Sequence, residues 1–445
     1  MLKQGQQISI RAKGVDGRGD GFARLDSGQR IYVPGLLAGE LAIVTIEHIS
    51  RQTEVVRGRL HQLREPNPDR QRPPCRHQGK CSGCPLMIAT GALQRRLKRE
   101  MVQHLHGMVV DELVCLPEGD LGYRWSCKRV VGGERGRIRL GSYVRGSHHV
   151  ADMGACLVDH PDIRSCAQEV EQAANKLGIE PYDEQQATGD LRYVWFKTDG
   201  AGQVLVTLIT AEGAAAGHSR AGELAEALTR PAGVAQCAQS ERGNVIRGTQ
   251  VTQLRGAATL TVELSGERVV VGPLGFLQPN PPVAALAYEQ LVGTGRGELA
   301  IDLYAGTGIT TALLRKRFTE VVPCEADEAS AQALGVAPQR AEDLLATILA
   351  DPDGPAPELV IANPPRAGLG ETVCAQLDEL ATQRGAPDQL RIMSCSPAAM
   401  ARDVKRLTGN EHPFRLVGTR VYDTLPNTAH VELVSWLERK KANPR

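Results

Sequence analysis

Cys395 is the residue of this chain best placed for nucleophilic chemistry. It lies in the sequence Ser-Cys-Ser-Pro at 394–397, directly after the apolar run 390–393. The run predicts a buried strand, and the proline predicts the first turn of a following helix. Further along the chain, Glu432 supplies a carboxylate that can act as a general base. A thiol and a carboxylate together indicate covalent catalysis of a group transfer.

The segment 302–308, Asp-Leu-Tyr-Ala-Gly-Thr-Gly, predicts a cofactor loop between a strand and a helix expected over 310–318. Its two glycines allow close approach of a ligand to the backbone. The third glycine of a dinucleotide fingerprint is replaced by Thr311, which favours a ligand without phosphates, such as S-adenosylmethionine. Glu325 ends the next expected strand, where a carboxylate can bind both hydroxyls of a ribose.

Asn363 opens the sequence Asn-Pro-Pro-Arg at 363–366, after another apolar run. Two prolines restrict the backbone to extended conformations, which would fix Asn363 at the carboxyl edge of a sheet. Ligands bind at that edge in open α/β sheets. The tripeptide also suits methylation of an exocyclic amine. That chemistry normally uses an aromatic residue in the fourth place, where Arg366 stands here.

A group of cysteines predicts a metal site in the first third of the chain. Five residues separate Cys75 from Cys81, and two separate Cys81 from Cys84. Three thiolates at this spacing bind a soft metal or a cluster and require a fourth ligand from elsewhere. Cys156 is the preferred fourth ligand because it follows a strand-like stretch. The weaker candidates are Cys166, His77 and His160.

The elements that must position these groups fall into three parts. Short alternating strands with glycine-rich turns predict a small β-barrel over residues 1–64. Residues 65–275 begin with a proline-punctuated linker and continue with the mixed pattern of an α+β domain. Residues 276–445 alternate apolar strands with helices rich in alanine and leucine, which predicts a parallel α/β sheet. The expected strands of that sheet are 299–303, 321–325, 359–362 and 390–394.

Composition limits the class of protein. The 445 residues are 42% hydrophobic and 23% charged, as in a soluble protein of several domains. No stretch approaches the roughly 18 apolar residues of a membrane span, and the first residues do not open a signal peptide, so we expect a cytoplasmic protein without a membrane partner. The 11 cysteines are then not expected to form disulfides.

The charge is distributed unevenly along the chain. Residues 1–150 hold 25 Lys and Arg against 14 Asp and Glu, whereas the remaining residues hold 27 against 37. An excess of positive charge in one part favours a polyanion as the partner of that part. Solvated charged faces alone are the alternative explanation of this asymmetry.

These motifs, in this order, resemble the uracil-5 RNA methyltransferase family over nearly the whole chain. The glycine-rich segment 17–23 is similar to its TRAM domain, and the segment 276–280 is similar to its Phe-x-Gln-x-Asn sequence. The four cysteines match the ligands of its [4Fe-4S] cluster in spacing and order. The two most specific motifs are Ser-Cys-Ser-Pro at 394–397 and His-Val-Glu at 430–432.

The resemblance implies an OB-like TRAM barrel, a central domain with an iron–sulfur cluster and a Rossmann-like domain that uses S-adenosylmethionine. It implies that Cys395 and Glu432 methylate carbon 5 of a uridine in ribosomal or transfer RNA, in a monomeric protein. The residues that fall on the family's cofactor positions are Gln278, Tyr304, Gly306, Glu325 and Asn363. The implied cluster ligands are Cys75, Cys81, Cys84 and Cys156.

Departures from the family keep other interpretations open. The family usually has Asp where Asn363 stands, so the alternative function is an RNA-binding or RNA-folding protein with lost or minor catalysis. Amine methylation through Asn-Pro-Pro is a third hypothesis. Zinc is the alternative to the [4Fe-4S] cluster, because cysteine spacing does not distinguish the two.

Overall fold

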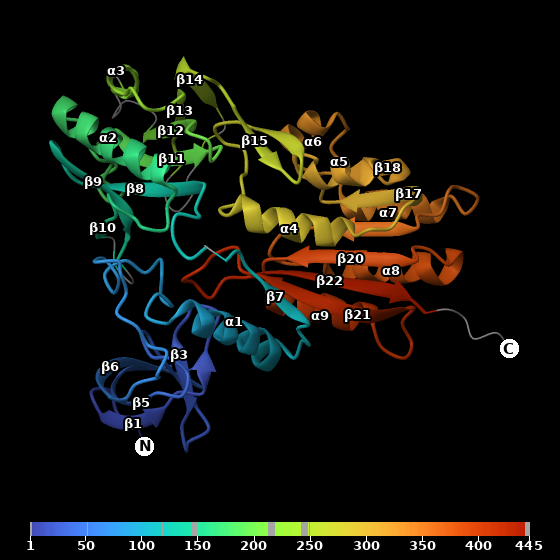
Figure 1. The fold of residues 1–445 in the computed structure, drawn as a ribbon, viewed down its shortest axis with the longest axis horizontal. Helices are drawn as coiled ribbons and strands as arrows, with labels where there is room; N and C mark the ends of the chain where they lie inside the picture. The colour runs from blue at the N-terminus through green and yellow to red at the C-terminus, as the bar shows by residue number, and fades with distance from the viewer. Residues whose placement is uncertain are drawn as a thin grey trace.

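The computed structural model contains three large sheets with helices packed around them (Figure 1). The described residues are 2–50, 52–117, 119–144, 147, 149–211, 219–241, 248 and 250–440. Each sheet has its own buried apolar core, as expected for a chain of this length.

The amino-terminal sheet has six strands in the order β1-β5-β6-β4-β3-β2. Its inward side chains, among them Ile31, Val44 and Val56, alternate with exposed residues and form a closed apolar cluster. The barrel topology of a TRAM domain stays a prediction. The strands are β1 Gln7–Arg11, β2 Gly14–Val15, β3 Gly21–Arg24, β4 Arg30–Val33, β5 Leu41–Ile49 and β6 Val55–Glu65.

The central sheet has seven strands in the order β10-β9-β8-β11-β12-β13-β14, and only β12 and β13 pair in parallel. Helices α2 Pro161–Leu177 and α3 Ala221–Ala227 pack against it, and the hairpin β15 Leu260–Leu264 and β16 Glu267–Val271 follows it. The strands are β8 Ser126–Glu134, β9 Arg137–Tyr143, β10 Val150–Asp152, β11 Leu191–Thr198, β12 Val204–Ala211, β13 Gly233–Gln239 and β14 Val251–Gly256.

The carboxyl-terminal sheet has the order β18-β17-β19-β20-β22-β21-β7. Its first four strands are parallel, and β22 runs antiparallel to both of its neighbours. The strands are β17 Gly297–Leu303, β18 Phe318–Cys324, β19 Leu359–Ala362, β20 Gln389–Ser394, β21 Phe414–Tyr422, β22 Glu432–Arg439 and β7 Glu112–Val114. The predicted alternation of strands and helices is therefore present.

Helices cover both faces of this sheet. Ile301 and Leu303 point into one core and Ala300 into the other, as the pleat of a strand requires. The first core includes α7 Ala341–Ala350, α8 Gly370–Arg384 and α9 Pro397–Leu407, together with α1 Gly91–His106; the second includes α4 Pro281–Val292 and α5 Ile309–Arg315. The short helix α6 Glu328–Leu334 follows β18.

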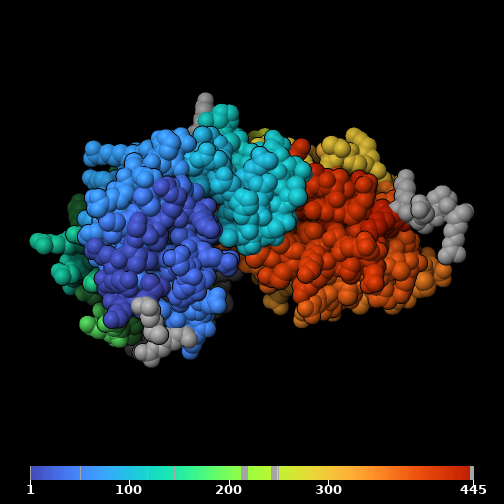
Figure 2. Space-filling view, turned by 90° about the horizontal axis from the view of Figure 1, so that it is seen from below, coloured from blue at the N-terminus to red at the C-terminus, as the bar shows by residue number. Residues whose placement is uncertain are grey.

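Helix α1 and strand β7 connect the amino-terminal half to the carboxyl-terminal sheet. Helix α1 contacts both β2 and α9, and β7 pairs in parallel with β21 at the edge of the sheet. Figure 2 shows this cyan part of the chain between the blue amino-terminal part and the red carboxyl-terminal part. Within the described residues, no helix combines the length and the apolar character needed to cross a membrane.

The helix and the strand that follow the glycine loop differ most from the sequence prediction. The helix expected over 310–318 ends at Arg315, because Phe318 already begins β18. The strand expected over 321–325 consequently starts at Phe318 and ends at Cys324, so Glu325 lies just beyond it. The buried side chain of Phe318 explains the shift, since it packs in the core beside α4 and α5.

Candidate active site

The nucleophile candidate Cys395 lies in a tight turn between β20 and α9. The backbone N–H of Ser396 donates to Oγ of Ser394 at 3.1 Å, and Oγ of Ser396 accepts from the N–H of Ala399 at 3.3 Å, which caps the helix. Pro397 occupies the first turn, where its missing N–H is not needed. These local contacts hold the thiol, which is half-buried, at the carboxyl end of a buried strand.

The base candidate Glu432 begins the neighbouring strand β22. Ser394 is the register partner of Leu433, so continuing the antiparallel register places Cys395 opposite Glu432. Burial raises the pKa of the Glu432 carboxyl to about 7, and the charge of Arg366 opposes that rise. A carboxyl with this pKa can exchange a proton near neutral pH.

Arg366 acts electrostatically on both groups, and its role was not predicted from the sequence. Its guanidinium hydrogen-bonds the thiol of Cys395, and its charge acts on both Cys395 and Glu432. The pKa of the Cys395 thiol is raised by burial and by the charge of Glu432, whereas Arg366 lowers it. The position of Arg366 after Asn-Pro-Pro, at the carboxyl edge of the sheet, was the signal that could have identified it.

The predicted cofactor loop lies at the carboxyl end of β17. Tyr304, Gly306 and Gly308 have φ of 61°, 57° and 91°. Tyr304 is in a left-handed conformation that a side chain other than glycine adopts at an energetic cost, and such strain gathers at ligand sites. A Cβ at Gly308 would lie 2.4 Å from the end of the Leu334 side chain, which would have to shift, and the φ of 91° favours glycine at this position.

Two side chains hold the loop in shape. The carboxylate of Glu325 accepts from the N–H of Gly306 at 2.8 Å, and the buried Asp302 accepts from the hydroxyls of Thr310 and Thr311 at 2.8 and 2.7 Å. Burial raises the pKa of Asp302 to about 6. Thr311, which replaces the glycine of a dinucleotide fingerprint, is thus a fixed part of the loop.

Gln278 connects the loop side of the site to the base. Its side chain hydrogen-bonds the hydroxyl of Tyr288 on α4, and the charge of Glu432 raises the pKa of that tyrosine together with burial. Beside it, Asn280 is 1% exposed and its side-chain amide has no hydrogen-bond partner in the described part of the chain. Because an unpaired buried amide is costly, this group would be satisfied by a ligand or water. An unpaired polar group of this kind fits a polar ligand such as S-adenosylmethionine.

Asn363 lies directly after β19, the strand next to β17. Its backbone N–H donates to the carbonyl of Leu303 at 3.3 Å, which places it beside the cofactor loop. Tyr304, Gly306, Glu325 and Asn363 thus lie at the ends of β17, β18 and β19, with Cys395 and Glu432 at the next two strands of the same edge, whereas the recorded contact of Gln278 is with Tyr288 on α4. The roles assigned to these residues stay predictions.

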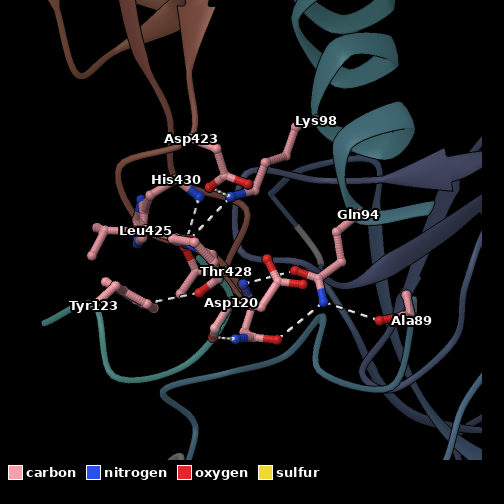
Figure 3. A network of polar contacts seen from close by, with 11 residues as sticks. Ala89, Gln94, Lys98, Asp120, Tyr123, Asp423, Leu425, Thr428 and His430 are labelled. Atoms are coloured by element: carbon pink, nitrogen blue, oxygen red, sulfur yellow. Dashed lines mark hydrogen bonds and ion pairs between the residues drawn. The ribbon is translucent and has the colours of Figure 1, made fainter. Parts of the chain in front are cut away.

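A loop before Glu432, residues 423–430, is held by the distant helix α1 (Figure 3). The ammonium of Lys98, which is 0% exposed, contacts Asp423 at 2.5 Å and the carbonyl of Leu425 at 3.0 Å. Gln94 and Asn427 exchange two hydrogen bonds, of 3.0 and 2.7 Å. Asn427 has a φ of 66°, so this loop conformation depends on the contacts around it.

The same loop contacts the region of the four cysteines. The hydroxyl of Tyr123 donates to the carbonyl of Pro426 at 2.9 Å (Figure 3). The backbone N–H of Leu86 donates to the carbonyl of Asn427 at 3.0 Å. Leu425 packs in a small apolar cluster with Met87 and Tyr123 that also includes the four cysteines. The base-bearing loop is therefore in contact with the predicted metal region.

The four predicted cluster ligands line one cavity. Cys75, Cys81 and Cys84 come from the loop before α1, and Cys156 follows β10. The candidate Cys166 lies in the separate core under the central sheet, and His160 caps α2, whereas His77 lines the cavity. Four thiols around a shared cavity fit an iron–sulfur cluster by donor chemistry.

A single metal ion is not supported by this arrangement. Among the described residues, no three His, Cys, Asp or Glu side chains are placed to hold one ion. A tetrahedral zinc site would require its thiolates to converge on one point. The geometry of the described residues therefore does not support the zinc alternative, and the iron–sulfur cluster stays a prediction.

The mostly parallel part of the carboxyl-terminal sheet, with a glycine loop after β17, has the architecture of a Rossmann-like domain. No family model matches the chain. Proteins described as uncharacterized RNA methyltransferases are similar to it over nearly their whole length. They include one from Clostridium tetani (26% identity, 97% of this chain and 96% of that protein), one from Listeria monocytogenes (28%, 98% and 98%) and one from Geobacter sulfurreducens (29%, 98% and 91%).

A solved structure shares the fold of the whole chain. It is the tRNA (uracil-54, C5)-methyltransferase of Pyrococcus abyssi in complex with S-adenosyl-L-homocysteine, with a TM-score of 0.73, 21% identity, and coverage of 96% of this chain and 99% of that one. The predicted resemblance is confirmed at the level of RNA methyltransferases by the similar proteins, and the solved structure shows a shared fold.

Proposed function

We propose that this protein methylates carbon 5 of a uridine in RNA, using S-adenosylmethionine as the methyl donor. The observation that carries the proposal is the placement of Cys395 opposite Glu432, with Arg366 hydrogen-bonded to the thiol. The full-length similarity to RNA methyltransferases supports RNA as the substrate class.

The chemistry requires both groups. Carbon 5 of uracil is too weak a nucleophile to attack a methyl sulfonium unaided. Addition of the Cys395 thiolate to carbon 6 forms a carbon–sulfur bond and an enolate, whose carbon 5 then takes the methyl group while the donor leaves as a thioether. Removal of the carbon 5 proton by ionised Glu432 lets the carbon–sulfur bond break and restores the thiolate.

Arg366 resolves an electrostatic conflict in this pair. The charge of the Glu432 carboxylate raises the pKa of the Cys395 thiol, in addition to the effect of burial. The guanidinium lowers the pKa of both groups, so both reactive anionic forms become accessible. Amine methylation through Asn-Pro-Pro would require a nucleobase to stack on the residue at position 366. The contact of Arg366 with the Cys395 thiol argues against such stacking.

A trapping experiment tests the proposal. RNA containing 5-fluorouridine cannot lose a proton from carbon 5, so the full-length protein with methyl donor should form a stable protein–RNA adduct that mass spectrometry maps to Cys395. Cys395→Ala should abolish the adduct, whereas the matched control Cys115→Ala, at another half-buried cysteine, should retain it.

Other outcomes distinguish the alternatives. RNA binding without methyl transfer by the native protein would favour an RNA-folding protein. Transfer that yields an N-methylated nucleoside on digestion would favour the amine hypothesis. Normal 5-methyluridine formation by Cys395→Ala would overturn the mechanism.

A further inference from the structure

A surface groove of about 590 Å³ lies between the start of β8 and the segment that leads into α4. One wall comes from the central sheet and the other from residues 274–279. The lining residues used in the argument are Arg124, Lys128, Trp195, Phe276, Leu277 and Leu425.

The two walls are joined, so the groove is a fixed feature. The N–H of Trp125, just before β8, donates to the carbonyl of Pro279 at 2.7 Å. The ammonium of Lys197 on β11 donates to the carbonyl of Gly272 at 3.0 Å. A preformed groove can accept a ligand with little cost of ordering.

The chemistry of the lining is cationic and aromatic. Phe276 is 67% exposed, which is unusual for a large aromatic side chain. Lys128 is the register partner of Trp195, and its ammonium lies 4.1 Å from the centre of the indole ring. Nε of Arg124 is buried and has no hydrogen-bond partner in the described part of the chain.

Acidic residues distinguish this groove from other hollows. Two hollows of similar size on the carboxyl-terminal part have carboxylates in their linings, Glu371 and Asp378 in one and Glu112 and Glu289 in the other. The described residues that line the groove include no acidic side chain. Charge complementarity therefore favours an anionic ligand with flat apolar faces, which is the chemistry of a nucleotide.

The groove opens beside the active site. Gln278 lies in the sequence between the lining residues Leu277 and Pro279, and its side chain contacts Tyr288. The charge of Glu432 contributes to the raised pKa of Tyr288. Leu425, on the groove's edge, belongs to the loop that leads to Glu432. A ligand in the groove would thus be a neighbour of the reacting base.

We propose that this groove binds a nucleotide adjacent to the target uridine in single-stranded RNA, with its base against Phe276 and its phosphate near Arg124 and Lys128. This inference rests on the proposed function for its substrate class. Stacking on an exposed aromatic side chain and contact with cations are the usual means of holding unpaired RNA. Holding the neighbouring nucleotide would keep the target uridine out of any stack.

The test measures binding of a fluorescein-labelled single-stranded oligoribonucleotide to the full-length protein by fluorescence anisotropy. Phe276→Ala should weaken binding about fivefold to fiftyfold, and Phe276→Trp should restore it because an aromatic face is retained. Lys128→Glu should weaken binding about tenfold and lower the salt dependence by about one ion.

Matched controls lie elsewhere on the surface. Arg139→Glu makes the same charge change on β9 of the same sheet, and Val270→Ala removes another exposed apolar side chain. Both should bind RNA like the native protein. All five variants should bind S-adenosylhomocysteine normally in calorimetry. Phe276→Ala and Lys128→Glu should raise KM for RNA with little change in kcat.

The outcomes separate the groove from the proposed function. Native-like RNA affinity of both Phe276→Ala and Lys128→Glu would overturn the groove. So would a concentration-dependent dimer that Phe276→Ala dissociates without loss of RNA affinity, because a second copy would then be the occupant. Weaker RNA binding by the variants, with no 5-methyluridine formed by the native protein, would support the groove and contradict the proposed function.

Crosslinking tests the groove in the native protein, so the result does not depend on whether the variants fold. RNA carrying 4-thiouridine next to the target should crosslink under ultraviolet light to peptides containing Trp195 or Phe276. Crosslinks confined to the amino-terminal sheet would contradict the inference.

Discussion

Cys395 and Glu432 face each other on adjacent strands, yet the chain holds them by different means. The turn around Cys395 is fixed by Ser394 and Ser396, its immediate neighbours in sequence. The loop before Glu432 is fixed by Gln94 and Lys98, and the contact between Lys98 and Asp423 spans 325 residues. One half of the reacting pair thus depends on local structure, and the other depends on docking of the amino-terminal helix.

This difference has a consequence for how substitutions act. Damage to the nucleophile's turn should stay local, because its hydrogen bonds close within a few residues. Damage to the α1 contacts should reach the base, because a buried charge and a strained loop conformation would lose their partners together. Substitutions on the two sides can test this comparison.

The largest effect is expected for Glu432→Gln. The variant should lose about 10²–10⁴-fold in turnover, because an amide cannot remove the carbon 5 proton. It should also accumulate the covalent adduct with unmodified RNA, which denaturing gel electrophoresis can detect. The control Glu438→Gln, on the same strand, should keep native turnover. If Glu432→Gln formed no covalent adduct with the RNA, the general base would be a residue other than Glu432.

Lys98→Ala should have the next largest effect. It leaves Asp423 buried without its cation, which costs about 3–5 kcal/mol of unfolding free energy in chemical denaturation. Arg96→Ala, on the exposed side of the same helix, should change stability by no more than about 0.5 kcal/mol.

A double substitution sharpens this prediction. Lys98→Met with Asp423→Leu removes both charges and should recover most of the stability, because burial of a charged pair is itself costly. A Lys98→Ala protein as stable as the native one would show that α1 does not hold the base-bearing loop.

A pH profile tests the link between the two halves. The carboxyl of Glu432, with a pKa of about 7, must be ionised to act as a base, so kcat should rise with pH through about 7. Arg366→Gln should move this rise to higher pH, because the guanidinium lowers the pKa of Glu432. Arg366→Lys should move it less because it keeps the charge. If the pH profile of kcat were the same in Arg366→Gln as in the native protein, Arg366 would not be the residue that lowers the pKa of Glu432.

The pKa of Glu432 also predicts a pH-dependent stability. Because the pKa is raised on folding, the folded state favours the protonated carboxyl, and this contribution is lost as pH rises through about 7. Glu432→Gln should therefore be more stable than the native protein at pH 8 and equal to it at pH 4 in thermal unfolding.

Ser396→Ala should have the smallest effect. Loss of the cap on α9 should cost about 1 kcal/mol of unfolding free energy and leave the rest of the site in place. Ser396→Thr should retain most of this contribution, since threonine also caps helices. A loss as large as that of Lys98→Ala would remove the contrast between the two halves.

Local patterns in the sequence predicted much of the architecture around the site. The strand before Cys395 and the helix after Pro397 follow from an apolar run and a capping sequence, and the structure has both. The alternation of strands and helices predicted the parallel part of the carboxyl-terminal sheet correctly. These features depend on residues that are neighbours in sequence.

Features that depend on distant contacts could not be predicted in this way. Lys98 lies in a run of basic residues, 95–99, and nothing in that run shows that its ammonium is fully buried against Asp423 and Leu425. Arg366 was noted only as a substitute for an aromatic residue, because its contact with Cys395 arises from the order of β19 and β20 in the sheet.

Strand β7 gives the assembly of this protein a particular order in time. It spans residues 112–114, whereas β21, the strand with which it pairs, spans residues 414–422, so β7 leaves the ribosome long before its partner. Until β21 has been synthesised, residues 112–114 cannot pair with it. Closure of the catalytic sheet is thus a late event, and a chain that stops before β21 would release an incomplete sheet instead of a smaller enzyme.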